Sequence, residues 1–532
     1  MPLVTSRRAR VLAITAVAVL AGAGLGACEG SPGPAAPTAR PERNVVPAGN
    51  QPVRAPGRAD RIRFDRPAPK SKFTAPTKQP NLLMITVDDA AQVNMQYMPR
   101  LKKLIADQGV TIANGIAPTP ICVPARASLV SGQYAHNHGA LTISGESGGF
   151  ESFKDDNTLP VWLRKAGYDT MFIGKYLNGY GENGSNTYVP PGWSDWRATV
   201  DPTTYNFVKP TVNANGKNTS YRQYSTDLFS DLTVDMLSNP RREKHPWYLW
   251  VNYVAPHHGG PDAADDPSRV FPDDPHPVKT TTPDKRDEDT FTTITLPRSP
   301  DLFEKDTSDK AIISATQKRW SPTRKKELLE AHQQRVEALQ SVDRALARTV
   351  RTLRSTGQLK NTYIAFTSDN GYVVGEHNLA GKLWYFREIA GVPMYIRGPG
   401  LPHGTTSRTP VTNADWAPTF AALAGARPTR AVDGENVLPW LDTPTNTRVI
   451  PIEAYPVRGG TKALYNGVIV GPWTYVRTPG GRAELYYRKV DPWQLHNLRR
   501  DPRYREQLRV LAKLTDEYAT CAGKACHSGF FR

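Results

Sequence analysis

The chain has 532 residues and a formal net charge of +17, from 67 Lys and Arg against 50 Asp and Glu. More than half of this excess lies in residues 1–80, which hold 13 Lys and Arg against 4 Asp and Glu. The rest of the chain is only mildly basic, which argues against a nucleic-acid partner and suits an anionic substrate or an anionic lipid surface better.

The N-terminus has the features of an export signal. A basic start precedes an apolar run over residues 11–25, shorter than the about 20 residues that span a membrane. The following Leu25-Gly26-Ala27-Cys28 resembles the bacterial lipobox, in which the cysteine is lipidated; the alternative is an incidental cysteine in a cleaved signal. We expect residues 1–28 to be a lipoprotein signal peptide. Lipid on Cys28 would anchor the exported protein to the outer face of the bacterial cell membrane, or on the periplasmic side.

Residues 29–78 are rich in Pro, Ala, Arg and Gly and hold few large apolar side chains. Such a segment cannot bury enough surface to order itself, so it is predicted to be a disordered tether. The remaining 450 or so residues exceed one ordinary hydrophobic core. We expect a catalytic domain over residues 79–443 and a C-terminal α+β subdomain over residues 444–532.

The globular part alternates apolar runs with helical patterns. Strands are predicted at 81–87, 170–174, 245–254 and 362–368, and helices at 158–165, 325–356 and 413–425. This alternation indicates an α/β fold with a large mixed, mostly parallel sheet flanked by helices. The segment from about 261 to 324, rich in Pro, Asp, Lys and Thr, is predicted to lie near the mouth of the pocket.

After about residue 440 the segments become short, aromatic and β-branched, which predicts a small antiparallel sheet with a last helix over about 502–518. Cys521 and Cys526 then stand close together in TCAGKAC. In an oxidising compartment this spacing favours a disulfide. A metal site there would need two more soft ligands, and only His527 is nearby.

Polar residues follow four predicted strands: Asp88 and Asp89, Lys175, His257, and the pair Asp369-Asn370. Sites in open α/β sheets form at the carboxyl ends of the strands, so these residues can meet in one crevice. Each pair alone is equally typical of a turn or a cap. Two pairs on two buried strands favour oxygen ligands for Ca²⁺ or Mg²⁺.

Four further side chains carry positive charge or can donate a proton. Individually they are unremarkable surface or loop residues, but around a cation they would line a pocket for an oxyanion. They are Arg126, Lys175, His257 and Lys382. These residue types suggest metal-assisted transfer of an anionic group, either phosphoryl or sulfuryl.

One segment makes the family resemblance explicit. Cys122 to Gly132, CVPARASLVSG, resembles the signature of the sulfatase family, in which the cysteine is oxidised to the aldehyde formylglycine. NLLMITVDD, GKYLNGYG, APHHGGP and TSDNGYVVGEHNLAGK follow in the family's order over residues 81 to about 445. Finer features look like the N-acetylglucosamine-6-sulfatase and heparan-type branch. Two positions depart from the commoner pattern, Ala125 in place of Ser and Leu177 in place of His.

This resemblance implies an alkaline phosphatase-like fold and a sulfuric ester hydrolase that releases sulfate from a sulfated sugar, such as N-acetylglucosamine 6-sulfate, or from an aryl sulfate. A formylglycine-generating enzyme would modify Cys122. The hydrated aldehyde would attack sulfur, and its second hydroxyl would let the sulfated intermediate collapse. Ca²⁺ would be held by Asp88, Asp89, residue 122, Asp369 and Asn370. The implied catalytic residues are Cys122, Arg126, Lys175, His257 and Lys382. His136 and His377 are secondary candidates for substrate contact from their residue type, with polar contacts at a helix end or in a loop as the alternative.

Two alternatives remain open from the sequence. One is a phosphate or phosphonate monoester hydrolase of the same superfamily, since such enzymes share the metal site. The other is a surface lipoprotein that binds sulfated glycans without turnover because Cys122 is never modified.

Overall fold

A computed structural model describes residues 62, 73, 79–264, 266–267, 278–310, 312–313, 320–442 and 447–531. The predicted signal peptide with Cys28, and the predicted tether apart from Ile62 and Phe73, lie outside the described residues. Within the described part, no helix has both the length and the apolar character needed to cross a membrane.

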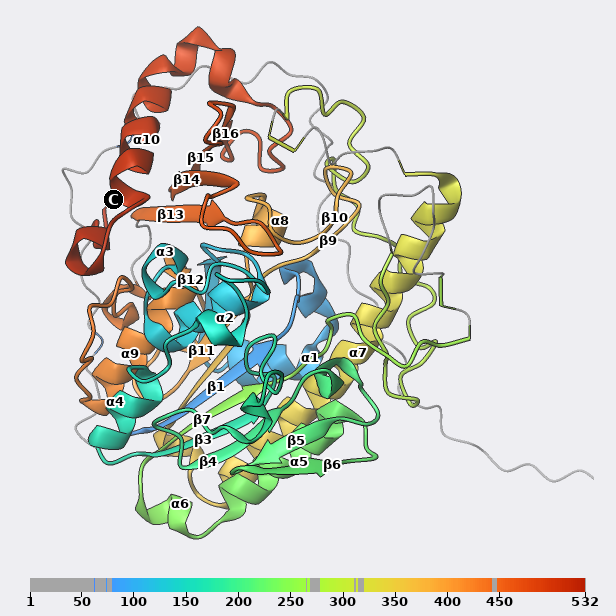
Figure 1. The fold of residues 1–532 in the computed structure, drawn as a ribbon, viewed down its shortest axis with the longest axis vertical. Helices are drawn as coiled ribbons and strands as arrows, with labels where there is room; N and C mark the ends of the chain where they lie inside the picture. Colours follow the sequence, from blue (N-terminus) through green and yellow to red (C-terminus); the bar gives the residue numbers. More distant parts are fainter. Residues whose placement is uncertain are drawn as a thin grey trace, which may run out of the picture. The chain divides into compact units, whose positions relative to one another are not determined.

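A ten-stranded sheet lies at the centre of the described chain (Figure 1). Its strand order is β12-β2-β11-β8-β1-β7-β3-β4-β5-β6. The neighbours from β8 to β4 are parallel, whereas β11, β5 and β6 run antiparallel to their neighbours. The strands are β1 Asn81–Val87, β2 Val110–Ile116, β3 Asp169–Gly174, β4 Asp195–Thr199, β5 Thr211–Ala214, β6 Lys217–Ser220, β7 Trp247–Asn252, β8 Thr362–Ser368, β11 Met394–Arg397 and β12 Thr405–Thr412.

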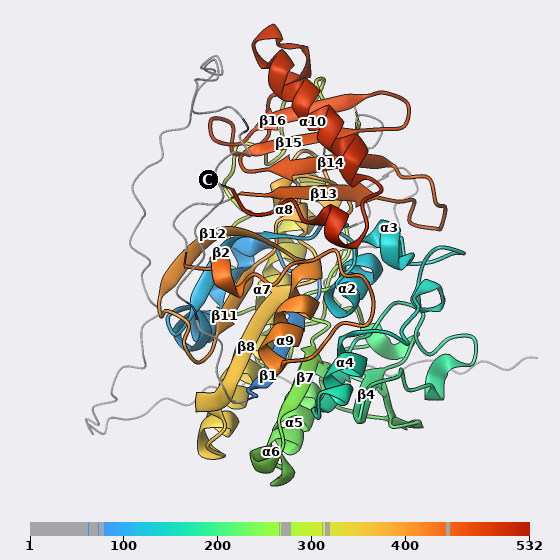
Figure 2. The same ribbon diagram turned by 90° about the vertical axis from the view of Figure 1, so that its left-hand side faces the viewer.

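The central strands β8, β1, β7 and β3 are buried on both faces, which explains their continuous apolar runs. In β1, Leu82 and Met84 belong to one core, and Leu83, Ile85 and Val87 belong to the other. Helices from different parts of the chain cover the two faces, as the views in Figures 1 and 2 show. One face packs against α2 (Cys122–Ser131), α4 (Leu159–Lys165) and α9 (Trp416–Ala424), and the other against α5 (Ser225–Ser238) and α7 (Pro322–Ser355).

Helix α2 begins at Cys122, two residues before Pro124. Pro124 is therefore the third residue of the helix, where its missing N–H costs no intrahelical bond. Gly132 ends the helix in the left-handed conformation, with φ of 72°. All ten residues of α2 are buried, so the helix starts inside the protein and carries Cys122 on its first turn.

A second sheet of four antiparallel strands lies after the large sheet in the chain, as the sequence predicted. Its order is β13-β14-β15-β16, with strands Val449–Ala454, Tyr465–Val470, Trp473–Arg477 and Ala483–Tyr487. Helix α10 (Arg505–Tyr518) lies on this sheet (Figure 2). The remaining short elements are α1 Pro99–Leu101, α3 Ala135–His138, α6 Arg241–Lys244, α8 Arg387–Ala390, β9 Val373–Val374 and β10 Ala380–Gly381.

The long helix α7 should contribute strongly to stability, because it covers much of one sheet face. Leu339 is fully buried in that core, so Leu339→Ala is expected to lower the free energy of unfolding by about 2–5 kcal/mol. Arg351→Ala, at an exposed position of the same helix, should change it by less than about 0.5 kcal/mol. Urea unfolding of both variants measures the difference, and equal effects would contradict the packing described here.

Candidate active site

Five polar side chains follow three central strands of the large sheet, at the edge where those strands end. Asp88 and Asp89 follow β1, Asp369 and Asn370 follow β8, and Lys175 follows β3. Strand β1 is parallel to its neighbours β8 and β7, and β3 is parallel to β7. The carboxyl ends of these strands therefore lie at the same edge of the sheet. None of the five residues is more than 1% exposed. The structure thus brings these residues together inside the protein.

The carboxylates at this edge are paired with buried cations. Nζ of Lys175 lies 2.5 Å from Oδ2 of Asp88. Arg126, on the second turn of α2, places Nε 2.8 Å from Oδ2 of Asp369 and Nη2 3.7 Å from Oδ2 of Asp88. An isolated buried charge costs several kcal/mol, so each of these groups depends on its partners.

Cys122 lies inside the same network. Its Sγ is 2.7 Å from Nζ of Lys382 and 3.7 Å from Oδ1 of Asp88. Nζ of Lys382 also lies 2.5 Å from Oδ1 of Asp89, to which Nδ2 of Asn370 donates a hydrogen bond of 2.8 Å. Residue 122 therefore sits between carboxylates and an ammonium group at the start of α2.

Two oxygen atoms of this cluster suit a cation. Oδ2 of Asp89 and Oδ1 of Asn370 are buried, and no described residue donates a hydrogen bond to either atom. A buried acceptor without a donor costs about 1–3 kcal/mol. Carboxylate and amide oxygens are also the ligands that hard divalent cations prefer. The residues present therefore fit the divalent cation that the sequence predicted.

The thiol of Cys122 is poorly placed to act as a thiolate. Burial raises its pKa to about 12, although the charges of Lys175 and Lys382 act in the opposite direction. The protonated thiol, a weak nucleophile, is the stable form at neutral pH. Cys122 is the free cysteine of the described chain, and it is buried.

The positive charges of the site are held in place by their acidic partners. Burial alone would lower the pKa of Lys382, but Asp89 raises it well above its ordinary value. Burial alone would also lower the pKa of Lys175, but the negative charge of Asp88 raises it overall. Burial, aided by the nearby Asp88, raises the pKa of Asp369 to about 6. The lysines thus remain charged across the physiological pH range and can hold an oxyanion.

His257 follows β7 and joins the cluster from the side. Its Nδ1 lies 2.6 Å from the carbonyl oxygen of His258, so Nδ1 carries the proton, and Nε2 lies 3.5 Å from Oδ2 of Asp89. Burial lowers the pKa of His257 well below its ordinary value, and the charge of Lys382 acts in the same direction. The ring is neutral, so Nε2 can give a proton to a leaving group only after taking one up.

The structure adds three residues to the site to which the sequence did not point, and Asn252 and Tyr205 are the first two. Oδ1 of Asn252, the last residue of β7, accepts a hydrogen bond of 3.1 Å from Nη1 of Arg126. The ring of Tyr205 stacks on His257, with centroids 4.5 Å apart, and lies 5.0 Å from Nζ of Lys175. The strand-end pattern that identified Asp88 could have found Asn252, whereas Tyr205 ends a short 3-10 helix, Thr203–Tyr205, where no such signal exists.

Arg335 is a third addition, and it comes from the middle of α7. Nη1 donates a 2.9 Å hydrogen bond to the carbonyl oxygen of Pro256, and Nη2 donates to that of Asp89. Its side chain therefore joins the segments after β1 and β7 from the helical layer. In the sequence it appears as one charged residue in an amphipathic helix, which gives no sign of this role.

The structure gives His377 different partners from those expected of a substrate contact. The side chain is fully buried, its Nδ1 lies 2.7 Å from Oε2 of Glu304, and its ring stacks on Phe386 with centroids 3.8 Å apart. None of these partners belongs to the cluster around Cys122.

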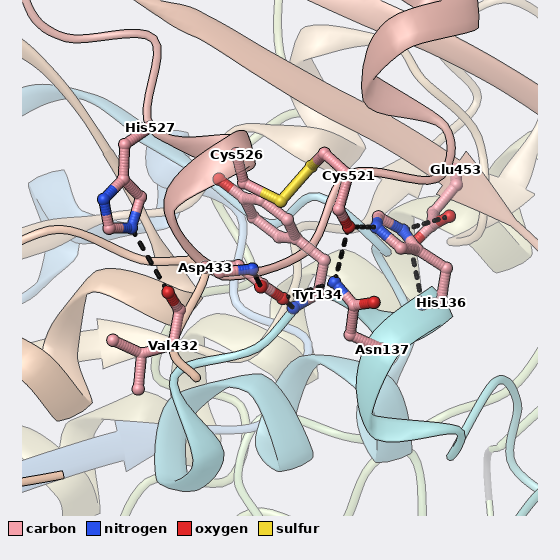
Figure 3. Close-up of a disulfide and its surroundings, with 10 residues drawn as sticks. Tyr134, His136, Asn137, Val432, Asp433, Glu453, Cys521, Cys526 and His527 are labelled. Atoms are coloured by element: carbon pink, nitrogen blue, oxygen red, sulfur yellow. Dashed lines mark hydrogen bonds and ion pairs between the residues drawn. A yellow bond between two sulfur atoms is a disulfide. The ribbon is translucent and has the colours of Figure 1, made fainter. Parts of the chain in front are cut away.

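His136 also has partners outside the cluster around Cys122, as Figure 3 shows. Nδ1 lies 3.0 Å from Oε1 of Glu453, on β13, and Nε2 lies 3.0 Å from the carbonyl oxygen of Cys521. His136 belongs to α3, the helix that follows α2. It therefore links the helical layer that carries Cys122 to the C-terminal sheet and the chain beyond it.

The disulfide predicted between Cys521 and Cys526 is confirmed (Figure 3). His527, the one possible additional soft ligand, instead places Nε2 3.2 Å from the carbonyl oxygen of Val432. The carboxylate of Asp433 accepts hydrogen bonds from the backbone of Gly523 inside the loop and from the backbone of Tyr134. The disulfide loop is thus fastened to the segment between α2 and α3.

Comparison with known proteins identifies this arrangement. The model of the sulfatase family matches residues 80–426, which is more than half of the chain. The chain belongs to the sulfatase family. It is accordingly a sulfuric ester hydrolase, and the large sheet with the smaller C-terminal sheet is the sulfatase fold.

Two relatives show how far the similarity extends. An arylsulfatase of Volvox carteri is 30% identical over 503 residues, covering 84% of this chain and 76% of the relative. An N-acetylglucosamine-6-sulfatase of Homo sapiens is 30% identical over 388 residues, covering 70% of this chain and 66% of the relative. The chain therefore spans just under two thirds of the length of the human sulfatase.

Two solved structures share the fold. One, in complex with its substrate D-glucosamine-2-N,6-O-disulfate, has a TM-score of 0.63 at 22% identity and covers 83% of this chain and 97% of its own. The other, a phosphonate monoester hydrolase of Agrobacterium radiobacter, has a TM-score of 0.60 at 20% identity and covers 82% and 94%.

The pairing of His136 with Glu453 should make stability depend on pH. Burial alone would lower the pKa of His136, but Glu453 raises it overall. The His136–Glu453 pair therefore stabilises the folded protein fully below the pKa of an unfolded histidine, about 6.5. This stabilisation is lost as the pH rises through the higher pKa of His136 in the folded protein. We expect His136→Asn to cost about 2 kcal/mol at low pH and less at high pH.

Denaturant unfolding between about pH 5.5 and pH 8.5 measures this dependence. The exposed His245 offers a matched control, because His245→Asn should change stability little at any pH. A difference between wild type and His136→Asn that stays constant, or grows as the pH rises, would contradict the assignment.

Proposed function

We propose that the protein hydrolyses sulfate esters of sugars with a formylglycine made from Cys122 and with a bound divalent cation. The observation that carries this proposal is the position of Cys122, 2.7 Å from Nζ of Lys382 and 3.7 Å from a carboxylate oxygen of Asp88. An unmodified thiol with a pKa of about 12 is a poor nucleophile there. When residue 122 carries the aldehyde, its hydrate supplies the hydroxyl that attacks sulfur.

Arg126, Lys175 and Lys382 would hold the substrate. Their charged groups converge on residue 122 from α2, the end of β3 and the segment after β10. Buried cations stabilise an oxyanion more strongly than exposed ones, because water does not screen them. In this role they orient the sulfate and offset the negative charge that develops as the ester bond breaks.

The leaving alcohol needs a proton, and two side chains are placed to provide it. Lys382 is charged and touches residue 122, whereas His257 is neutral and presents Nε2 to the site. We assign the proton to Lys382 or, after it has taken one up, to His257.

Asp88, Asp89, Asp369, Asn370 and residue 122 would hold the cation. The unpartnered oxygens of Asp89 and Asn370 support this ligand set, which contains the hard oxygen donors that suit Ca²⁺ and also admits Mg²⁺. The ion would withdraw charge from a sulfate oxygen.

The sugar substrate is proposed from the relatives. The human relative is named for its action on N-acetylglucosamine 6-sulfate, and a protein with the same fold was solved with a disulfated glucosamine. The Volvox relative is named an arylsulfatase, so aryl sulfates serve as convenient assay substrates.

We also propose that the protein acts outside the cytoplasm, held at the outer face of the membrane by lipid on Cys28. The lipobox-like Leu25-Gly26-Ala27-Cys28 supports the anchor. The Cys521–Cys526 disulfide supports an oxidising compartment. A formylglycine-generating enzyme would then act on Cys122 during maturation.

The competing activity is hydrolysis of phosphate or phosphonate esters, because a phosphonate monoester hydrolase shares the fold. Sulfate, phosphate and phosphonate monoesters with the same leaving group separate the two activities. We expect the largest kcat/KM for the sulfate ester. A larger value for either phosphorus ester would overturn the choice of substrate class, and a lack of turnover of all three by protein carrying the aldehyde would favour a glycan-binding role.

Removal of the Lys382 ammonium should lower activity without unfolding the protein. We expect Lys382→Met to reduce kcat/KM for a sulfate ester by about 10²–10³-fold, the effect typical of losing one group that stabilises transition-state charge. Lys165→Met, at an exposed position, is the control and should leave kcat/KM unchanged. Thermal unfolding of both variants checks that they fold, and full activity of folded Lys382→Met would remove Lys382 from the mechanism.

A further inference from the structure

A second cluster of metal-ligating side chains, two of them buried and one half-buried, lies outside the network around Cys122. Asp301, His377 and Glu388 each offer one ligand atom, and these atoms all lie within 4.8 Å of one another. The three residues come from separate parts of the chain. Asp301 lies in the segment before α7, His377 in the turn between β9 and β10, and Glu388 in α8.

Three carboxylate oxygens of this cluster are buried without a well-formed hydrogen bond in the described chain, whereas Oε1 of Glu388 lies 3.9 Å from Nε of Arg387. Asp301 is fully buried; the hydroxyl of Ser299 interacts with its carboxylate, but within the described chain neither carboxylate oxygen accepts a well-formed hydrogen bond. Oε2 of Glu388 is also buried without a donor in the described chain. Buried carboxylates need a proton, a charged partner or a metal ion, because burial of an isolated charge costs several kcal/mol.

The imidazole of His377 is oriented as a metal ligand would be. Nδ1 lies 2.7 Å from Oε2 of Glu304, and Nε2 lies 3.7 Å from Oδ2 of Asp301. A carboxylate that accepts the proton of one ring nitrogen directs the other nitrogen toward the ligand position, which is the usual outer partner of a metal-bound histidine. Lys310, 2.8 Å from Oε1 of Glu304, neutralises that outer carboxylate.

A route for an ion is present. Glu388 and the neighbouring Glu376 line an open cavity of about 470 Å³, together with Tyr372 and Ser299. The cluster is thus buried but lies beside a space that solvent reaches. A buried ion site needs such an access path.

We propose that Asp301, His377 and Glu388 bind a divalent transition-metal ion, with Zn²⁺ as the best match. One imidazole and two carboxylates suit Zn²⁺ better than Ca²⁺, which prefers a larger set of oxygen ligands. Two ligands of one zinc ion lie at most about 4.3 Å apart. The three ligand atoms, which lie within 4.8 Å of one another, are therefore close to the spacing that one ion requires.

This ion has a structural role that reaches the active site. Asp301 accepts a 2.8 Å hydrogen bond at its carbonyl oxygen from the backbone N–H of His377, and Phe303 donates one of 2.9 Å to Gly375. A bound ion would add a third connection, to Glu388 of α8. It would also fix the turn between β9 and β10 that holds His377 and from which the chain continues to Lys382. It would thereby position Lys382 without touching the substrate.

Zinc binding to the whole protein tests the proposal. Protein stripped with a chelator and returned to excess Ca²⁺ is dialysed against Zn²⁺, and bound zinc is measured by mass spectrometry of the elements. We expect one tightly bound Zn²⁺ per chain, which Asp301→Asn and Glu388→Gln weaken by about tenfold or more. Asp309→Asn, which alters a partly exposed carboxylate beside Lys310, should keep it.

Asp89→Asn separates this site from the active site. It removes a proposed ligand of the catalytic cation, so zinc that remains bound to this variant belongs to the second cluster. Loss of zinc binding in Asp89→Asn would overturn the proposal. So would zinc binding by Asp301→Asn and Glu388→Gln that is as tight as in the wild type.

X-ray absorption at the zinc edge of the unmutated protein gives an answer even if the cluster variants fail to fold. The proposal predicts nitrogen and oxygen ligands that include one imidazole. Sulfur ligation, or no zinc bound in the presence of Ca²⁺, would overturn it.

Discussion

The pairing of buried carboxylates with buried cations at the carboxyl edge of the large sheet is the constraint on which this structure depends. Asp88, Asp89 and Asp369 have no access to water, and they are tolerated because Lys175, Lys382 and Arg126 lie against them. None of these groups is stable there alone. A site assembled in this way is rigid before a substrate arrives, which is the condition for electrostatic stabilisation of a transition state.

The surrounding layers fix the elements that carry these charges. Helix α2 is buried along its whole length and brings both Cys122 and Arg126 to the strand ends. Arg335 of α7 binds the carbonyl oxygens of Asp89 and Pro256 from the opposite layer. The C-terminal sheet and the disulfide loop hold the region after α2 through His136 and Asp433. Groups distant in sequence therefore contribute to the placement of one residue, Cys122.

The sequence predicted the central strands and the strand-end residues because these features are local. Continuous apolar runs such as 81–87 identify strands that are buried on both faces, and polar residues directly after them mark the functional edge. Strands such as β12, which is exposed at its start and buried at its end, lack that pattern and were not predicted. The start of α7 was placed three residues late, because the cap by Ser321 precedes the apolar periodicity.

The partners of His136 and His377 could not be read from sequence for a related reason. Each was a secondary candidate for substrate contact, and the structure gives each polar partners elsewhere in the fold. Their actual partners, Glu453 and Glu304, lie 317 and 73 residues away in the chain. Contacts of this kind depend on tertiary packing, and no periodicity or motif records them.

The central claim is that residue 122 acts as an aldehyde hydrate and not as a thiol. Mass spectrometry of the peptide that contains residue 122, from active protein purified from its native host, tests it most directly. The account predicts the mass of formylglycine, with oxygen in place of sulfur and two hydrogens fewer than cysteine. An unmodified Cys122 thiol in material that turns over sulfate esters would contradict it.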